Sequence, residues 1–302
     1  MSDNARWVRP LGTAARDGWT VLIDDTVDGW SHTRLLVIDL EGGQSRTVEA
    51  GPWEHVVVPL EGSVTVRGVD GGGAAHSVRL TGRPSVFAGA TDVARLSRDC
   101  ELTISAENGP VRVAICGARA AGPCTPPLIR VDAGEVPVEL RGAGIASREV
   151  RNFGVPGVLD ADSVIACEVV TPSGNWSSWP PHKHDEERPG VETELEEIYY
   201  FEVRSTDGSA REGVGYQRVY GTAARPIDVL AEVRSGDVVL VPHGWHGPAM
   251  AAPGYDLYYL NVMAGPGPER AWLICDDPDH GWVRDTWPDQ PMDPRLPLGD
   301  AR

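Results

Sequence analysis

The chain alternates short runs of apolar, β-branched and aromatic residues with turns that are rich in glycine and proline. Many short strands at near-regular spacing are typical of an all-β sandwich or barrel, and helix signals are scarce. We therefore predict an all-β fold whose strands include residues 35–40, 54–60, 63–66, 101–104 and 111–115 in the first half and residues 164–170, 197–203, 215–220, 238–241 and 256–263 in the second.

The two halves follow one plan, although weakly. Glu54-His55 opens a strand in the first half as Glu196-Glu197 does in the second. A segment rich in proline and glycine at 120–127 marks the expected seam. We predict an N-terminal domain over residues 1–122 and a C-terminal domain over residues 123–302. The proline-rich end of the chain, from Trp287 onward, is expected to be an irregular arm that covers an edge strand or a partner subunit.

Composition narrows the class of protein. The net charge of -17 at pH 7 argues against a DNA, RNA or anionic membrane partner, because these bind basic surfaces. The five scattered cysteines form no CxxC pair and are expected to be reduced thiols in a cytoplasmic protein. The first residues lack the apolar core of a signal peptide. No apolar run reaches the roughly 18 residues that a membrane span requires.

Three separate motifs indicate a metal centre in the second half. His182 and His184 are one residue apart, so on a strand their side chains point to the same side, with Lys183 facing outward. Glu197 opens a later strand, and His246 follows a tight turn that begins at Gly236 and contains a proline and a further glycine. Three imidazoles and one carboxylate suit a first-row divalent transition metal.

Two neighbours compete for these roles. Glu196 competes with Glu197, which we prefer because its face of the strand also carries Tyr199. His243 competes with His246, but it lies within the turn itself, where it is expected to support the ligands or face solvent. The charged run at 185–188 is expected to be a solvated loop. In the first half His55 has no HxH partner, so we predict a domain without a metal.

Both motifs together resemble the cupin family, in which HxH with a downstream Glu is followed by G-x5-P-x-G and a final His. More closely, the segments PPHKHDEERPGVETELEEIYYFE, GYQRVYG, GDVVLVPHGWHGP and GYDLYYLNVMAGP resemble the 5-deoxy-glucuronate isomerase family of myo-inositol catabolism, which is related to the 4-deoxy-5-ketouronate isomerases. The resemblance implies a bicupin, with two double-stranded β-helix (jelly-roll) barrels. It also implies isomerisation of 5-deoxy-D-glucuronate to 5-dehydro-2-deoxy-D-gluconate. The metal ligands that it implies are His182, His184, Glu197 and His246.

The chemistry of such a reaction sets the expectations for the remaining residues. The metal is expected to be Zn²⁺, Mn²⁺ or Fe²⁺, and the partner a small sugar acid whose carboxylate binds a guanidinium, with Arg218 as the first choice. The candidates for the general base are Tyr199, Glu196 and His243, and further substrate contacts are expected from Gln217, Tyr220, Tyr259 and Asn261. Gln217 and Arg218 cannot both face the pocket from one regular strand.

Two other functions fit the same ligands. A cupin dioxygenase holds Fe(II) with such a set, and a bicupin that binds sugar without turnover would need only the pocket. A homo-oligomer is compatible with the sequence.

The stretch between His184 and Glu197 is longer than in the pectin enzymes, which weakens the assignment of Glu197 relative to the histidines.

Overall fold

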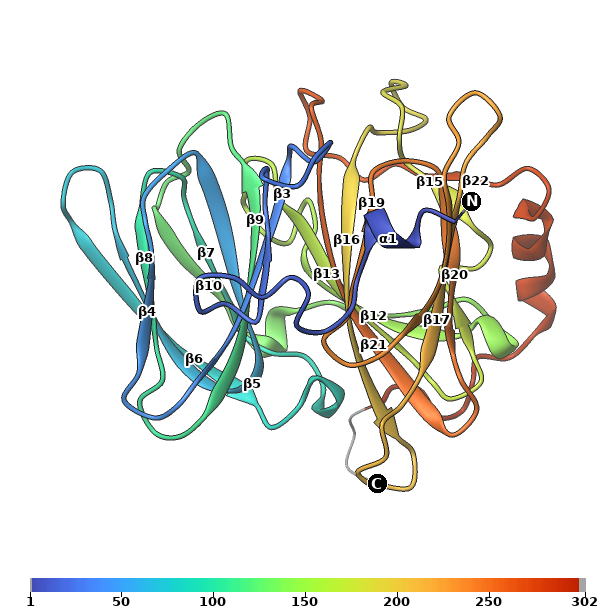
Figure 1. Ribbon diagram of the computed structural model, residues 1–302, viewed down its shortest axis with the longest axis horizontal. Coiled ribbons are helices and arrows are strands. Elements are labelled where there is room, and N and C mark those ends of the chain that lie inside the picture. The colour runs from blue at the N-terminus through green and yellow to red at the C-terminus, as the bar shows by residue number, and fades with distance from the viewer. Residues whose placement is uncertain (1, 299–302) are drawn as a thin grey trace.

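The computed structural model describes residues 2–298 and consists of two β-barrels that lie side by side (Figure 1). The prediction of an all-β bicupin is confirmed. Helical structure is confined to short pieces, which are α1 (Asn4–Trp7) and the 3₁₀ segments η1 (Val86–Ala88), η2 (Ala133–Glu135), η3 (Gly144–Ala146) and η4 (Gly281–Asp289).

The first barrel is organised around one long strand, β5 (Trp53–Val69). The first part of β5 pairs with β7 and β9, and its second part pairs with β6 and β8, so this strand belongs to both walls of the barrel. The other strands of this sheet system are β2 (Val21–Ile23), β3 (Thr33–Leu40), β4 (Ser45–Val48), β6 (Ala75–Arg83), β7 (Val93–Leu96), β8 (Glu101–Ser105), β9 (Val111–Arg119) and β10 (Leu128–Val131).

The second barrel has two antiparallel sheets. The larger sheet faces the first barrel, and its strand order is β1 (Val8–Arg9), β19 (Val238–Val241), β16 (Glu196–Ser205), β21 (Tyr255–Ala264), β13 (Ile165–Thr171), β12 (Arg148–Gly154) and β11 (Val138–Arg141). The smaller sheet has the order β18 (Asp228–Val233), β17 (Gly215–Tyr220), β20 (Trp245–Ala251), β15 (His182–Lys183) and β22 (Cys275–Asp276), and β14 (Trp176–Ser177) pairs with β20.

Each half of the chain contributes one short strand to a sheet of the other barrel. β1, at the start of the chain, pairs with β19 at the edge of the second barrel. β10, which follows the proline-rich seam, pairs with β7 of the first barrel. Residues 1–122 and 123–302 therefore do not divide the strands cleanly, because each expected domain contributes one strand to the other's sheet.

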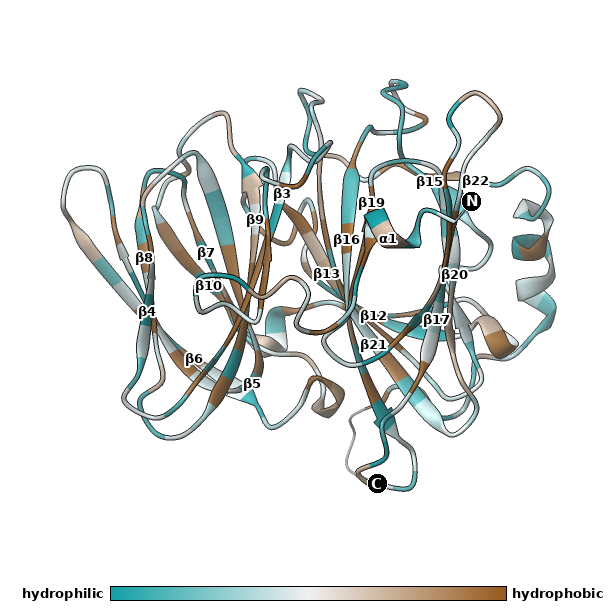
Figure 2. Ribbon diagram, viewed as in Figure 1, coloured by the Kyte–Doolittle hydropathy of each residue, from teal (hydrophilic) through white to brown (hydrophobic). Residues whose placement is uncertain are grey.

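The strands between the barrels are buried on both faces. On β3, Leu36 and Ile38 point into the apolar interior of the first barrel, whereas Leu35 and Val37 belong to a larger apolar cluster that extends through the second barrel. Continuous apolar runs are typical of strands that are covered on both sides. Figure 2 shows the hydrophobic residues along these central strands. The central strands of the first barrel thus contribute one face to that barrel's own core and the other face to a core shared with the second barrel.

A buried ion pair crosses the same interface. Arg83 of β6 contacts Glu168 of β13, with Nη1 3.0 Å from Oε2. Both side chains are almost fully buried, and the Tyr258 hydroxyl also donates to Glu168 over 2.6 Å. Burial raises the pKa of Glu168, but the Arg83 guanidinium outweighs it and holds that pKa below its usual value. Glu168 is therefore ionised within the interface.

The proline-rich end of the chain packs on its own barrel over the part that the structure describes. The backbone N–H of Asp293 donates to the Ser147 hydroxyl, and that of Leu298 donates to the Glu149 carboxylate. Residues 299–302 lie outside the described residues. All five cysteines are free, as the sequence predicts. Within residues 2–298 we find no helix with the length and apolar character needed to span a membrane.

Candidate metal centre and active-site cavity

Three histidines from the smaller sheet of the second barrel meet inside it. His182 is on β15, His184 follows directly, and His246 is on β20, where it is the cross-strand partner of His182. One nitrogen of each ring lies within 4.8 Å of those of the other two. The sequence prediction that these three side chains converge agrees with this geometry.

Backbone carbonyl groups orient two of these rings. His184 Nδ1 lies 3.2 Å from the carbonyl oxygen of Leu195, and His246 Nδ1 lies 3.1 Å from that of Gly244. A proton on each Nδ1 satisfies these contacts and leaves Nε2 with a lone pair directed into the site. Such a hydrogen bond to the far nitrogen is the usual support of a metal-binding histidine.

Glu197 of β16 completes the group from the opposite sheet. Its Oε2 lies 3.1 Å from Nε2 of both His184 and His246. Burial raises the pKa of Glu197, but the two imidazoles outweigh it and lower the pKa to about 2. His246 Nε2 is buried and has no hydrogen-bond partner, because its approach to Glu197 lacks hydrogen-bond geometry. An unpartnered imidazole nitrogen beside an ionised carboxylate fits a divalent cation that binds both.

A cavity of about 440 Å³ opens beside His182 and Glu197. One part of its wall is aromatic or polar, and includes Tyr199, Tyr259, Trp272, Ser178 and Asn261. Tyr199 stacks on Phe201 with ring centroids 6.0 Å apart, as expected from the shared face of β16. The cavity is thus large enough for a small molecule next to the proposed ligands.

Three arginines supply the positive charge of the cavity wall. Arg141 pairs with Glu139, and Arg284 pairs with Asp276. Arg148, at the start of β12, has no carboxylate within ion-pair distance anywhere in residues 2–298. Its Nη1 donates only to the Ala146 carbonyl, over 3.1 Å, and burial lowers its pKa to about 10.

An arginine in this position favours an anionic ligand. Arg148 is only 5% exposed, and what remains accessible faces the cavity. A buried cation without a counter-ion is unfavourable, and a carboxylate that binds it bidentately relieves that cost. Among the three arginines of the cavity wall, Arg148 is thus the one without a carboxylate partner in residues 2–298.

Three other predicted site residues line the cavity. Burial raises the pKa of Tyr199 well above its usual value, with Glu197 as the next cause, and burial raises the pKa of Tyr259 to about 12. The Tyr259 hydroxyl lies 3.2 Å from the Ser178 hydroxyl. Asn261 leaves its Nδ2 amide without a partner. Both phenols are protonated at neutral pH and are available to donate hydrogen bonds.

Glu196 and His243 do not line the cavity, so the structure corrects their expected place as candidate bases. Glu196 points to the other face of β16, where its carboxylate accepts the backbone N–H groups of Ser31, His32 and Thr33 of the first barrel at 3.1, 2.7 and 2.6 Å. His243 lies in the turn before β20, outside the cavity wall, and burial lowers its pKa.

The three residues expected on β17 also lie outside the cavity wall. Arg218 is on the outer face of the barrel, pairs with Asp228 over 2.6 Å and does not line the cavity, so the structure does not bring it to the place expected for a substrate carboxylate. Gln217 points inward, as the alternation requires, but its buried amide has no hydrogen-bond partner. The Tyr220 hydroxyl is bound to Asp277 instead of facing a ligand.

Sequence reasoning missed Arg148, Arg284 and Asp276. Asp276 is the cross-strand partner of His182 on the short strand β22, and Arg284 is on η4. No motif marks these residues, because they reach the cavity from segments on either side of the HxH and His246 motifs. The only signal was general, since an acidic protein that binds an acidic ligand needs a local arginine.

Comparisons with known proteins identify the family of the chain. The chain matches the KduI/IolB family over residues 7–283. It is 37% identical over 287 residues to a 5-deoxy-glucuronate isomerase of Geobacillus kaustophilus, an alignment that covers 93% of this chain and 96% of that relative. The isomerase of the same name from Bacillus subtilis strain 168 is 37% identical over 254 residues, covering 84% and 88%.

Solved structures give the same family. An IolB-like protein of Salmonella typhimurium LT2 is 33% identical and superposes with a TM-score of 0.80, covering 92% of this chain and 98% of that one. An oxalate decarboxylase of Lactobacillus farciminis superposes with a TM-score of 0.63 at 11% identity, covering 89% and 88%, and shares the fold alone. Sequence identity, coverage and fold together establish that the chain belongs to the KduI/IolB family.

Proposed function

We propose that this protein is a metal-dependent isomerase that converts 5-deoxy-D-glucuronate, an aldose acid, to the ketose acid 5-dehydro-2-deoxy-D-gluconate. The observation that carries this proposal is the presence of Arg148 in the same cavity as the histidine group and Glu197. A substrate of this kind has a carboxylate at one end and a carbonyl with a neighbouring hydroxyl at the other. The cavity offers a group suited to each end.

The histidines and Glu197 would hold a divalent transition metal, Zn²⁺, Mn²⁺ or Fe²⁺. When bound, such an ion supplies Lewis-acid polarisation of the substrate carbonyl and hydroxyl oxygens. His182, His184 and His246 would each offer it one ring nitrogen, and Glu197 would contribute one negative charge. Because these ligands come from two facing sheets, the barrel walls fix their separation.

Arg148 orients the substrate. Its guanidinium binds the carboxylate, and the burial of this side chain at 5% exposure makes the contact stronger than a surface ion pair would be. Anchoring this end places the aldehyde end toward His182 and Glu197. Binding at both ends reduces the freedom of the substrate before any proton moves.

The proton transfer needs a base and a donor in the same cavity. We assign the base to Asp276, which is the cross-strand partner of His182. Asp276 and Glu197 are the two carboxylates among the described residues of the cavity wall. Asp276 accepts the proton from the carbon that carries the hydroxyl group and returns it to the former aldehyde carbon, while the proton of that hydroxyl group passes to the former aldehyde oxygen, so that a ketone and a new hydroxyl group result. Tyr199 and Tyr259 keep their phenolic protons at neutral pH and donate hydrogen bonds to the oxygens on which charge develops.

An NMR assay tests the activity directly. Protein loaded with Zn²⁺, Mn²⁺ or Fe²⁺ in turn is incubated with 5-deoxy-D-glucuronate, and the appearance of the ketose is followed by ¹H and ¹³C spectra. We expect turnover with at least one of these ions and none after chelation. Absence of ketose with every ion, in protein that elemental analysis shows to be loaded, would refute the proposal. We place this reaction in the cytoplasm, where the five free cysteines stay reduced.

A further inference from the structure

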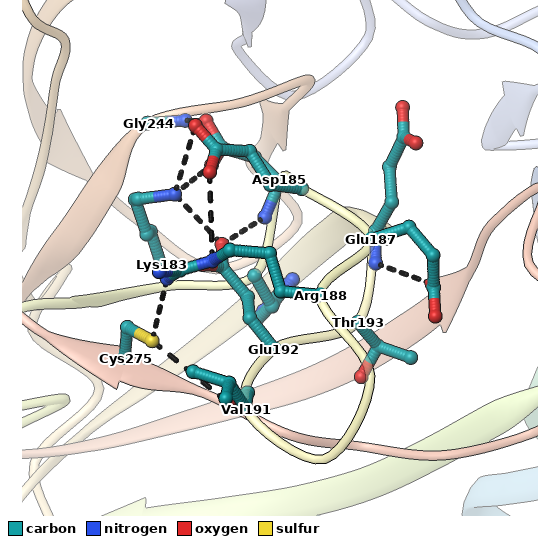
Figure 3. A network of polar contacts seen from close by, with 12 residues as sticks. Lys183, Asp185, Glu187, Arg188, Val191, Glu192, Thr193, Gly244 and Cys275 are labelled. Atoms are coloured by element: carbon teal, nitrogen blue, oxygen red, sulfur yellow. Dashed lines mark hydrogen bonds and ion pairs between the residues drawn. The ribbon is translucent and has the colours of Figure 1, made fainter.

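The loop between the ligands His184 and Glu197 is folded around two buried carboxylates, Asp185 and Glu192. In the charged run at 185–188, Glu186, Glu187 and Arg188 are exposed as expected for a solvated loop, whereas Asp185 is buried. The Asp185 side chain is 7% exposed and that of Glu192 is not exposed at all. Glu192 accepts a hydrogen bond from Lys183 Nζ over 2.8 Å and another from the Asp185 backbone N–H over 2.8 Å. Arg188 pairs with the other carboxylate oxygen of Glu192. Figure 3 shows these contacts.

Asp185 connects this loop to the turn that carries the third histidine. Its Oδ1 accepts from Lys183 Nζ over 2.6 Å, and its Oδ2 accepts from the backbone N–H of Gly244 over 2.9 Å (Figure 3). Arg225 reaches the same carboxylate, with Nη1 3.1 Å from Oδ2. The carboxylate therefore bridges two segments that are about sixty residues apart in the sequence.

Gly244 links Asp185 to His246 through two hydrogen bonds. Its N–H is held by Asp185, and its carbonyl oxygen accepts the Nδ1 proton of His246. The residue has φ +93°, and a Cβ there would lie 2.7 Å from the Tyr220 carbonyl oxygen, so the turn requires glycine. With both of its polar groups bound, this glycine has little freedom to rotate and fixes the direction of the His246 ring.

Lys183 couples the same network to the other two ligands. It is the middle residue of the HxH motif, so its side chain leaves the strand on the side opposite to His182 and His184. There it binds Asp185 and Glu192, and only 12% of the side chain is exposed. The segment that carries two ligands and the turn that carries the third are thus joined through one carboxylate.

We propose that Asp185 is a positioning residue of the metal centre, which sets the orientation of His246 and its distance from His182 and His184. Asp185 does not itself touch the ion or the substrate. This inference rests on the proposed metal site but not on the identity of the substrate. Hydrogen-bonded groups behind a ligand typically change metal affinity by about 10- to 100-fold when they are removed.

The test compares Asp185→Asn with Glu187→Gln. The first variant keeps the size of the side chain but places an amide among Lys183, Arg225 and the Gly244 N–H. The second removes a neighbouring charge on an exposed side chain of the same loop. Metal-free proteins are titrated with Co²⁺ in competition with a chelator, and the visible absorption of bound Co²⁺ reports the geometry of the ligands. Circular dichroism and thermal unfolding of the metal-free variants check that they are folded.

We expect Asp185→Asn to bind Co²⁺ about 10- to 100-fold more weakly and with an altered visible spectrum, whereas Glu187→Gln matches the wild type. Co²⁺ affinity and spectrum unchanged in a folded Asp185→Asn protein would overturn the inference. Wild-type protein that binds no Co²⁺ would instead refute the metal site itself, so the two failures are distinguishable.

A milder variant keeps the test decisive if Asp185→Asn does not fold. Arg225→Gln removes one partner of Asp185 whose side chain is 46% exposed, so its effect on folding is expected to be small. We expect a weaker change in the same direction, of a few-fold in Co²⁺ affinity. A Co²⁺ affinity and spectrum equal to those of the wild type in Arg225→Gln would then count against the role of Asp185.

Discussion

Glu54 and Glu196 make equivalent contacts across the barrel interface, because the carboxylate of each accepts backbone hydrogen bonds from the other barrel. Glu54, on β5 of the first barrel, accepts the backbone N–H groups of Asp162, Ser163 and Val164 at 2.9, 2.5 and 2.6 Å. Glu196, on β16 of the second barrel, accepts three consecutive backbone N–H groups of the first barrel, at residues 31–33. Each glutamate thus holds the backbone at the start of a strand of the other barrel, which is β3 for Glu196 and β13 for Glu54.

This reciprocity extends to the neighbouring residues. Glu197, which follows Glu196, points into the second barrel and belongs to the candidate metal centre. His55, which follows Glu54, shares a face of β5 with Val57, which belongs to the apolar interior of the first barrel. Burial lowers the pKa of His55 to about 3, so this histidine is neutral. The two halves therefore share this contact but differ in the residue that follows it. That residue is a carboxylate beside the histidines in the second barrel and a neutral imidazole in the first.

The backbone hydrogen bonds of Glu54 and Glu196, which we call the two carboxylate clamps, stabilise the contact between the barrels. We expect Glu54→Gln and Glu196→Gln each to lower the free energy of unfolding by about 1.5 to 3 kcal/mol, because an amide presents an NH₂ group to donors that need an acceptor. Urea denaturation followed by fluorescence measures this change. Glu49→Gln, at an exposed position, is the control, and equal stability of all three variants and the wild type would contradict the clamp role.

The ion pair between Arg83 and Glu168 predicts a pH-dependent stability. The pKa of Glu168 is lower in the folded protein than its usual 4.5, so its ionised form stabilises the fold above about pH 4.5, and this contribution is lost as the pH falls through the lowered value. We expect Glu168→Gln to be less stable than the wild type at pH 7 and the difference to shrink below pH 4.5. Denaturation curves at several pH values measure this difference, and a gap that stays constant with pH would argue against ionised Glu168.

Removing the cation alone is expected to cost more. In Arg83→Met the carboxylate of Glu168 stays buried without its guanidinium, and breaking a buried pair in this way costs about 3 to 5 kcal/mol. The measurement is the free energy of unfolding at pH 7. Arg79→Met, on the same strand and exposed, serves as the control and should be close to the wild type. Comparable stability of both variants would show that the pair does not hold the barrels together.

The histidine group predicts the loss of bound metal on substitution. In His182→Ala combined with His184→Ala only one imidazole and one carboxylate remain, too few to hold a transition metal tightly. We expect elemental analysis to find less than a tenth of the wild-type metal content. His76→Ala, in the first barrel, should retain full content. Stoichiometric metal in the double variant would disprove the site.

Arg148 and Arg218 form a matched pair for testing recognition of the substrate carboxylate. Arg148→Met is expected to lower kcat/KM by about 10- to 100-fold, mainly through KM, because a hydrogen bond to a charged group contributes about 1.5 to 3 kcal/mol. Arg218→Met removes only an outward ion pair with Asp228 and should leave the kinetics unchanged. Steady-state kinetics with the uronic acid decide between them, and the reverse result would restore Arg218 as the carboxylate-binding residue.

Local rules of chain geometry made much of the candidate site predictable from the sequence. Two histidines separated by one residue share a side of any strand, and Glu197 shares a face with Tyr199 for the same reason. The Gly-rich turn before His246 could likewise be read from its residue types. Such features depend only on neighbours in the sequence, so the three motifs identified the candidate ligands before their contacts were seen.

Tertiary structure decided everything that depends on which segments lie next to one another. Arg148 faces the cavity while Arg218 faces away from it because of strand order in the two sheets, which no local pattern encodes. Glu196 was correctly placed opposite Glu197, yet only the packing of the barrels shows that the first barrel's backbone lies there. Asp185 looked like a solvated residue, and its burial follows from the turn at Gly244, which is remote in the sequence. Residue types and spacing determine side-chain direction within a strand, whereas the partner that a side chain meets is set by long-range packing.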